Sequence, residues 1–426
     1  MDTDHIARPA QVSGTHIDRR GTVRRLAGVL THPQGRARTH AKKTQGESNM
    51  ATFKSGLLAS ALCLSPFAAH AVVVSLPALN VDTTNITVSG LSSGAVMAVN
   101  LGWAYSATFR GVGVFAGTPY LCQYNYAYTA CQNNNTISTA MLNNMQGDID
   151  GFSGNTIDNK ANVQTQEIYL FTGTKDTTVG PRPMQAVQTQ YANNGAPTVS
   201  LIQRANTAHV FPTDFNATGN NPCAVSLSPY ISNCSYDGAK AVLSTFYGAL
   251  VARNNTPSAS NYLEFNQREF TPNLGMANTG WTYVPAACAA GTQCKLHVAF
   301  HGCAQNYATI GDKFVKNTGY TRWADTNNII VLFPQAQADN NLYPTPANGT
   351  VGNPNACWDT VGFYGANYAQ KAGVQLSAIK AMVGRLASAS QEGPPGGHGA
   401  RRAPGAPVAS AGSARASCPP SARTRA

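Results

Sequence analysis

The sequence predicts an open α/β fold in which a mostly parallel, doubly wound sheet is buried between helices. Short runs of aliphatic and β-branched residues recur along the chain, and most of them end in a glycine-rich turn. They lie at 85–90, 111–117, 167–173, 198–203, 296–302 and 328–334. Unbroken apolar runs of this length are typical of strands buried on both faces of a parallel sheet. Helix-compatible stretches such as 180–193 and 236–253 separate several of the runs, and this alternation indicates βα units.

The folded unit is expected to span residues 72–386 as one domain. Residues 50–71 combine a Met, one Lys, a short apolar run and the sequence Ala69-His70-Ala71, which is the layout of a secretory signal peptide with a small-x-small cleavage site. We interpret residues 1–49 as translated upstream sequence or a disordered segment, with Met50 as the natural start. Residues 387–426 are rich in Gly, Pro, Ala, Ser and Arg without apolar periodicity, so we expect a disordered tail.

The charge distribution argues against a nucleic-acid-binding protein. The whole chain has a formal charge of +11, but residues 72–388 contain 15 Lys and Arg against 14 Asp and Glu. The excess of positive charge therefore belongs to the two ends of the chain. An interface for phosphate backbones would require basic residues gathered on the folded surface.

The cysteines agree with export from the cell. Eight of the ten lie inside the expected folded unit, at 122, 131, 223, 234, 288, 294, 303 and 357. An even number of cysteines in an exported chain suggests disulfides. The chain contains no C-x-x-C pair, so we do not expect a zinc site. Eight cysteines allow 105 pairings. Near neighbours favour Cys122–Cys131, Cys223–Cys234 and Cys288–Cys294, which leaves Cys303–Cys357.

The first strand leads into a candidate nucleophile elbow. Gly90-Leu-Ser-Ser-Gly94 fits G-x-S-x-G directly between an apolar strand and a small-residue helix start, which is the context that this motif needs in α/β-hydrolases. The spacing selects Ser92, and not Ser93, as the nucleophile. The alternative is a structural Ser-Gly turn, because the bare motif often occurs by chance.

A serine nucleophile needs a base, and the folded unit contains three histidines. His297 lies in the middle of a strand, where a core histidine is the simpler interpretation. His301 stands at a strand end before Gly302, in the form of an oxyanion loop. His209 follows the last strand of the first series, where hydrolases place the base. We therefore select His209, with a packing or capping histidine as the alternative.

The residue that orients this base should follow the preceding strand. Asp176 follows the strand run at 167–173 in Gly173-Thr-Lys-Asp176, and Asp214 is the second candidate, although it could instead brace the loop after the histidine. The resulting order of Ser92, Asp176 and His209 along the chain is that of α/β-hydrolases rather than that of chymotrypsin or subtilisin.

Two backbone amides are expected to stabilise the tetrahedral intermediate. One is the N–H of Ser93 at the start of the helix, and the other is the N–H of Cys303. The loop that carries the second donor normally precedes the nucleophile in the chain, but here it follows Ser92 by some two hundred residues. This order of motifs predicts a circularly permuted α/β-hydrolase.

At this point the chain resembles the circularly permuted catalytic domain of extracellular poly(3-hydroxybutyrate) depolymerases. The motifs that carry the resemblance span most of the unit, and they are Gly-Leu-Ser-Ser-Gly at 90–94, Gly-Thr-Lys-Asp at 173–176, Ala-His-Val-Phe-Pro-Thr-Asp-Phe at 208–215, His-Gly-Cys-Ala-Gln at 301–305 and Asn-Ala-Cys-Trp-Asp at 355–359. It implies the same triad and oxyanion amides, and contact of Trp358 with polymer at the cleft. The alternative for Trp358 is a plain core tryptophan. We also expect His301 to contribute to substrate binding.

The resemblance implies a secreted carboxylic ester hydrolase that degrades poly(3-hydroxybutyrate) (PHB) or a related polyhydroxyalkanoate. We expect no cofactor, no metal, no nucleic-acid or membrane partner, and a monomer. Many members of the family carry a linker and a C-terminal polymer-binding domain, whereas this chain has only the basic tail, so adsorption to a solid granule would depend on the catalytic face. The alternatives are a feruloyl or acetyl-xylan type carbohydrate esterase and a non-catalytic surface-binding module.

Overall fold

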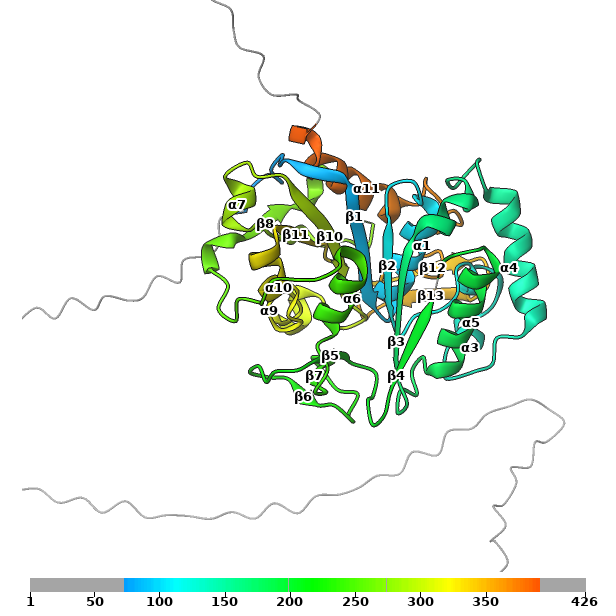
Figure 1. The fold of residues 1–426 in the computed structure, drawn as a ribbon. Helices are drawn as coiled ribbons and strands as arrows, with labels where there is room; N and C mark the ends of the chain where they lie inside the picture. Colours follow the sequence, from blue (N-terminus) through cyan, green and yellow to red (C-terminus); the bar gives the residue numbers. More distant parts are fainter. Residues whose placement is uncertain (1–72, 198, 273, 391–426) are drawn as a thin grey trace, which may run out of the picture. The chain divides into compact units, whose positions relative to one another are not determined.

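The computed structural model describes residues 73–197, 199–272 and 274–390, and its centre is an eight-stranded sheet (Figure 1). The strand order is β4-β3-β2-β1-β10-β11-β9-β8. Six strands run parallel and include all six that the sequence predicts: β1 (Val81–Leu91), β2 (Gly111–Phe115), β3 (Glu167–Gly173), β4 (Ser200–Arg204), β10 (Cys294–Phe300) and β11 (Ile329–Phe333). Two further strands that the sequence does not predict, β8 (Tyr262–Asn266) and β9 (Thr279–Tyr283), extend the sheet by antiparallel pairing.

Helices cover both faces of this sheet, as expected for a doubly wound fold. Alternate residues of a strand point to opposite faces. In β3, for example, Leu170 packs into the core on one face and Phe171 into the core on the other. The first core contains side chains of α1 (Ser93–Ala104), α4 (Thr139–Phe152), α5 (Pro181–Asn193) and α11 (Val374–Leu386). The second contains side chains of α6 (Gly238–Tyr247), α9 (Lys313–Asn317) and α10 (Tyr320–Asn327).

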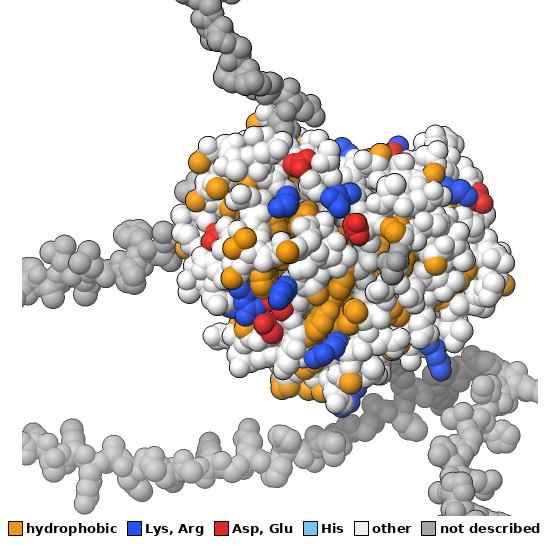
Figure 2. Space-filling model, viewed as in Figure 1, with side chains coloured by type: hydrophobic (Ala, Val, Ile, Leu, Met, Phe, Trp, Pro, Cys, Tyr) orange, Lys and Arg blue, Asp and Glu red, His pale blue; other side chains and the backbone are white. Residues whose placement is uncertain are grey.

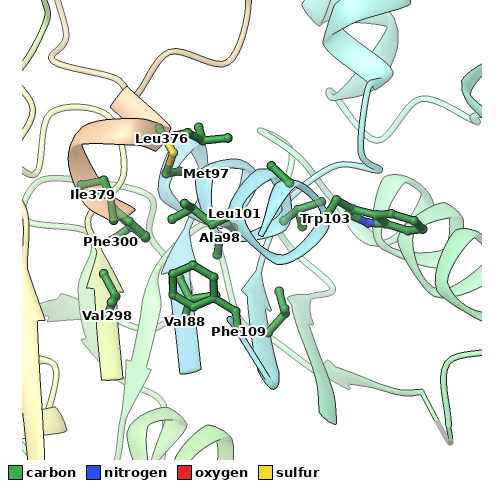
Figure 3. Close-up of a cluster of buried hydrophobic side chains, with 14 of the residues drawn as sticks. Val88, Met97, Ala98, Leu101, Trp103, Phe109, Val298, Phe300, Leu376 and Ile379 are labelled. Atoms are coloured by element: carbon green, nitrogen blue, oxygen red, sulfur yellow. The ribbon is translucent and has the colours of Figure 1, made fainter. Parts of the chain in front are cut away.

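Helix α1 is buried along its whole length. Figure 3 shows Met97 and Leu101 of this helix between Val88 of β1 and Leu376 of α11, so the helix that begins at the candidate nucleophile lies between the sheet and the last helix. Small residues such as Ala98 allow this close approach to the sheet. The position of the elbow is therefore fixed by packing on several sides.

The topology is that of a circularly permuted α/β-hydrolase. The strand that leads to the G-x-S-x-G turn, β1, is the first of the sheet along the chain but lies at its middle, beside β10, which comes much later. The two ends of the unit lie together, since the N–H of Leu79 donates to the carbonyl of Leu386 at 2.8 Å. Neighbouring ends of this kind are what allow a chain to be opened at one place and closed at another.

The remaining elements are short and lie around the sheet. They are a three-stranded sheet of β5 (Phe211–Thr213), β6 (Asn221–Pro222) and β7 (Ile231–Asn233), a hairpin of β12 (Asp339–Thr345) and β13 (Gly349–Asn353), the helices α2 (Cys122–Asn125), α3 (Tyr128–Cys131), α7 (Ala286–Ala289) and α8 (Tyr307–Ile310), and four 3-10 turns at Lys160–Thr165, Ala259–Asn261, Gln267–Glu269 and Ser388–Ser390.

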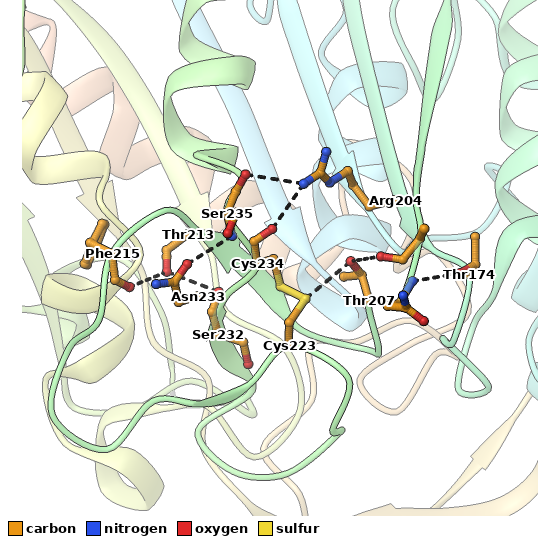
Figure 4. The surroundings of a disulfide bond; sticks show 12 residues. Thr174, Arg204, Thr207, Thr213, Phe215, Cys223, Ser232, Asn233, Cys234 and Ser235 are labelled. Carbon is orange, nitrogen blue, oxygen red and sulfur yellow. Dashed lines mark hydrogen bonds between the residues drawn. A yellow bond between two sulfur atoms is a disulfide. The ribbon is translucent and has the colours of Figure 1, made fainter.

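The eight cysteines form four disulfides in the pairs favoured by the sequence: Cys122–Cys131, Cys223–Cys234, Cys288–Cys294 and Cys303–Cys357. Figure 4 shows the surroundings of the second pair. There the guanidinium of Arg204, at the end of β4, donates to the carbonyls of Cys234 and Ser235 at 3.2 and 3.3 Å. This contact ties the small sheet to the edge of the large one.

The expected signal segment at 50–71, residues 1–49 and the tail from 391 onward lie outside the described residues. Residues 387–390, expected to begin the tail, belong to the described part and end in the 3-10 turn Ser388–Ser390. In the part that the structure describes, no helix is both long and apolar enough to span a lipid bilayer. On the face drawn in Figure 2, basic and acidic side chains are interspersed, in agreement with the near-neutral charge of this part of the chain.

Candidate active site

Ser92 stands at a strained turn between β1 and α1. Its backbone has φ 58° and ψ −123°, a conformation that is costly for a residue with a side chain. A Cβ at Gly90 would lie 2.3 Å from the carbonyl oxygen of Gly94, and a Cβ at Gly94 would lie 2.3 Å from the carbonyl oxygen of His301. Both glycines are therefore required by close backbone approach. This is the steric arrangement of a nucleophile elbow.

His209 and Asp176 form a hydrogen-bonded pair. The ring Nδ1 of His209 lies 2.8 Å from Oδ2 of Asp176, and both residues are buried. The other carboxylate oxygen, Oδ1, accepts the backbone N–H groups of Thr178 and Val179, each at 2.9 Å. Burial raises the pKa of Asp176, but the nearby His209 and these two amides outweigh it, so the pKa lies below its usual value. An ionised carboxylate is thus held against the imidazole.

The second candidate for this position, Asp214, binds an arginine and not the imidazole of His209. Its Oδ1 binds the guanidinium of Arg253 at 2.6 Å, and the same guanidinium binds Asp237 at 2.5 Å. Asp214 therefore braces the loop after His209.

Two backbone amides beside Ser92 make no hydrogen bond within the described part of the chain. They belong to Ser93, at the first position of α1, and to Cys303. The amides on either side of Cys303 are occupied, because Gly302 donates to Oε1 of Gln305 at 2.7 Å and Ala304 donates to the carbonyl of Asn355 at 2.6 Å. The free amides are those expected to serve as oxyanion donors.

A cavity of about 510 Å³ brings these groups together. Ser92, Ser93, His209 and Cys303 all line it, and Asp176 lies behind His209. Apolar and polar side chains form the rest of the wall, including Leu91, Val96, Thr118, Gln123, Tyr128, Gln132, Val179, Tyr230, Val351, Asn353, Pro354, Asn355, Thr360, Val361 and Phe363. A mainly apolar cleft with a few polar groups is typical of a site for a small or chain-like organic ligand.

The structure corrects the expectation that Trp358 presents its ring to a substrate. The side chain is 0 % exposed and does not line the cavity, although the neighbouring Cys357 and Thr360 do. Its Nε1–H donates to the carbonyl of His301 at 2.9 Å, and its ring packs edge-on against Phe300. Trp358 is therefore a core residue directly behind the wall.

The ring of His301 is also away from the cavity, so the expectation of direct substrate contact is not met. It is fully buried, and burial lowers its pKa to about 4. His297 is a core histidine, as the sequence indicated, because its two ring nitrogens lie 2.8 Å from the hydroxyls of Thr87 and Ser89. Burial lowers the pKa of His297 to about 3.

Three residues that support the site received no role from the sequence. Gln305 accepts from Gly302 and also donates through Nε2 to the carbonyl of Pro229 at 2.7 Å. The backbone carbonyl of Asn355 accepts the N–H of Ala304, the residue after Cys303. The buried carboxylate of Asp359 accepts the backbone N–H groups of residues 361–364, which include two residues of the cavity wall. All three stand in the short motifs quoted above, which is the only signal that could have marked them.

Comparison with known proteins identifies the family. No family model matches the chain. A polyhydroxybutyrate depolymerase from Talaromyces funiculosus is 47% identical over 329 residues, which cover 76% of this chain and 96% of that protein. A poly(3-hydroxybutyrate) depolymerase from Delftia acidovorans is 44% identical over 335 residues, which cover 75% of this chain and 63% of that longer protein.

Solved structures agree with these relatives. The PHB depolymerase from Penicillium funiculosum is 48% identical with a TM-score of 0.70, and the match covers 74% of this chain and 99% of that one. A serine-to-alanine PHB depolymerase variant complexed with an R3HB trimer is 47% identical, also with a TM-score of 0.70 and the same coverage. The α/β-hydrolase topology and the extent of these matches lead to one conclusion: the chain belongs to the polyhydroxybutyrate depolymerase family.

Proposed function

We propose that this protein is a secreted serine esterase that hydrolyses the ester bonds of poly(3-hydroxybutyrate) through an acyl-enzyme. The observation that carries the proposal is the pairing of His209 with buried Asp176 at the cavity that also holds Ser92 in its strained turn. The relatives named above supply the substrate, since they are depolymerases of this polyester and one of them is complexed with an R3HB trimer.

In the first half of the reaction, the Ser92 oxygen attacks the ester carbonyl and its proton passes to Nε2 of His209. Asp176 holds Nδ1–H of the ring, so that Nε2 is free to accept this proton. The oxyanion of the tetrahedral intermediate receives hydrogen bonds from the amides of Ser93 and Cys303. The intermediate then collapses, the bond to the alkoxy oxygen breaks, and His209 returns the proton to the hydroxyl end of the departing chain.

In the second half, water takes the place of the departed hydroxyl. His209 accepts a proton from the water as it attacks the acyl-enzyme, and a second tetrahedral intermediate forms on the same two amides. Its collapse releases a carboxylic acid and returns the proton to Ser92. The products are shorter oligomers and 3-hydroxybutyrate.

The nucleophile assignment is tested by two neighbouring serines. Ser92→Ala should reduce esterase activity to background with the fold intact. Ser93→Ala should keep much of the activity, because the reaction uses the backbone amide of Ser93, whereas its hydroxyl only accepts a long hydrogen bond from the N–H of Trp358 at 3.4 Å. A fluorophosphonate should label the wild type and Ser93→Ala but not Ser92→Ala. A labelled and active Ser92→Ala would contradict the assignment. A wild-type protein that is neither labelled nor active would support the non-catalytic surface-binding module instead.

The substrate is tested by clearing of suspended polyhydroxybutyrate against release of ferulate or acetate from soluble carbohydrate esters. The family relationship favours the polyester. Faster turnover of a feruloyl or acetyl-xylan ester than of the polymer would transfer the assignment to a carbohydrate esterase.

Export is the remaining part of the proposal. We propose that the segment at 50–71 directs secretion, that the mature chain begins near Val72, and that it acts as a monomer. The four disulfides support an oxidising compartment. Intact-mass analysis of the secreted product should place its first residue near 72, and retention of residues 1–49 on an active secreted product would overturn this part.

A further inference from the structure

The peptide bond between Gly302 and Cys303 lies directly beside the candidate nucleophile. A Cβ built at Gly302 would lie 3.1 Å from Cβ of Ser92 and 3.1 Å from the carbonyl oxygen of Leu91. Whichever end of this peptide points toward Ser92 therefore decides the electrostatics of the site. An N–H would stabilise an oxyanion there, and a carbonyl oxygen would repel it.

The carbonyl end of this peptide is bound to the ring of His301. Nδ1 of His301 lies 2.7 Å from the carbonyl oxygen of Gly302. The other ring nitrogen, Nε2, lies 3.0 Å from the backbone nitrogen of Ala336, which can only donate. Nε2 is therefore the acceptor, and the proton of the neutral ring sits on Nδ1 and is donated to Gly302.

This bond has a consequence for the opposite end of the peptide. Residues 302 and 303 are joined by a trans bond, in which C=O and N–H point in opposite directions. The ring of His301 is fully buried and packs against Trp358 at 5.2 Å, whereas Cys303 lines the cavity. With its carbonyl held toward the buried ring, the peptide must turn its N–H away from that ring.

We propose that His301 is a positioning residue that holds the Gly302–Cys303 peptide in the orientation in which the Cys303 amide serves the oxyanion. The inference rests on the proposed function, because it assumes that Ser92 is the nucleophile. A second bond to the same carbonyl, from the backbone N–H of Gln305 at 3.3 Å, is longer and cannot replace it fully. Without His301 only this longer bond holds the carbonyl of Gly302, so the orientation of the peptide is less restrained and the second oxyanion donor is lost for part of the time.

The test uses the different reach of two amide side chains. An asparagine places its NH₂ close to the position of Nδ1 of a histidine, and a glutamine places its amide close to Nε2. His301→Asn therefore keeps the donor to Gly302, whereas His301→Gln keeps only the acceptor for Ala336. His297→Gln, at the other buried histidine of the same strand run, is the control for loss of a core ring.

We measure kcat and KM on p-nitrophenyl butyrate, inhibition by a trifluoromethyl ketone and the melting temperature for each variant. Complete loss of an oxyanion donor costs a factor of about 10² to 10³ in kcat. We expect His301→Gln to lower kcat by a factor of about 10 to 10², to weaken the inhibitor in parallel and to leave KM within about twofold. His301→Asn should recover most of kcat, and His297→Gln should lower the melting temperature with little change in kcat.

Equal losses of kcat in His301→Asn and His301→Gln, or a loss in proportion to the melting temperature, would overturn the proposal. The wild type offers a second measurement that does not depend on a variant folding. The ¹⁵N spectrum of its histidine side chains should show His301 as the Nδ1–H tautomer, and an Nε2–H tautomer would overturn the proposal as well. An inactive wild type would instead point to failure of the proposed function itself.

Discussion

Replacing Asp176 by asparagine changes one atom of the proposed triad, and the structure determines how the new amide must sit. Oδ1 of Asp176 accepts two backbone N–H groups, from Thr178 and Val179, each at 2.9 Å. An NH₂ group at that place would meet two donors, so the carbonyl oxygen of the new side chain has to remain there. The NH₂ group must then face Nδ1 of His209, across the 2.8 Å that separates Nδ1 from Oδ2 in the wild type.

That arrangement reverses the tautomer of the imidazole. Nδ1 becomes the acceptor, the ring proton moves to Nε2, and Nε2 no longer has a lone pair for the proton of Ser92. The equivalent change in a serine protease lowers kcat by a factor of about 10⁴ with little structural change. This factor corresponds to about 5.5 kcal/mol of transition-state stabilisation. We expect a loss of the same order here, with KM on p-nitrophenyl butyrate nearly unchanged.

The matched control is Asp214→Asn, which alters the second candidate for the same role. Asp214 is partly exposed and bound to Arg253, so this variant should keep kcat within about threefold. Initial rates on the short ester, with circular dichroism to verify the fold, decide between them. An Asp176→Asn enzyme with more than a tenth of the wild-type kcat, or an inactive Asp214→Asn enzyme, would refute the reasoning.

Packing and burial also determine how three other changes should affect the protein. Gly94→Ala places a Cβ 2.3 Å from the carbonyl oxygen of His301, so the variant should melt far below the wild type or not fold; a normal melting curve would contradict the clash. Trp358→Ala removes a fully buried side chain, so it should lower the melting temperature and reduce the rates on polymer and on short ester by similar factors; a loss confined to the polymer would show that the ring meets substrate after all. Burial lowers the pKa values of His297 and His301 to about 3 and about 4. Between pH 6.5 and pH 5 these two histidines therefore bind protons in the unfolded chain but not in the folded one, which lowers stability. Asp359, with its pKa raised to about 6, binds a proton in the folded chain over the same range and offsets part of this loss. Denaturant titrations should therefore show a net loss of about 2 kcal/mol in the free energy of unfolding on going from pH 6.5 to pH 5, and equal stability at both values would argue against neutral buried rings.

The sequence predicts two kinds of site feature: those that depend on steric constraints between near neighbours in the chain, and those for which few residues of the required type are present. The elbow at Ser92 needs small residues on both sides within five positions, so its pattern is visible in the chain itself. The base could be selected because the folded unit contains only three histidines. Three of the four disulfides join near neighbours, and the fourth followed from the remaining pair. The circular permutation was visible because the order of motifs is a property of the chain.

Only the tertiary structure decided which side chains face the cavity. His301 and Trp358 stand in motifs beside the reactive groups, and proximity in the sequence suggested contact with substrate. Their burial depends on contacts between distant parts of the chain. The ring N–H of Trp358 binds the carbonyl of His301, 57 positions away, and its backbone N–H meets the hydroxyl of Ser93, 265 positions away at the start of α1. The sequence already favours Asp176 over Asp214, and the structure adds the partners: Asp176 pairs with His209, and Arg253 holds Asp214. A strand or a turn is set by neighbours in the chain, but the face that a loop residue presents is set by whatever packs behind it, and no local pattern encodes that partner.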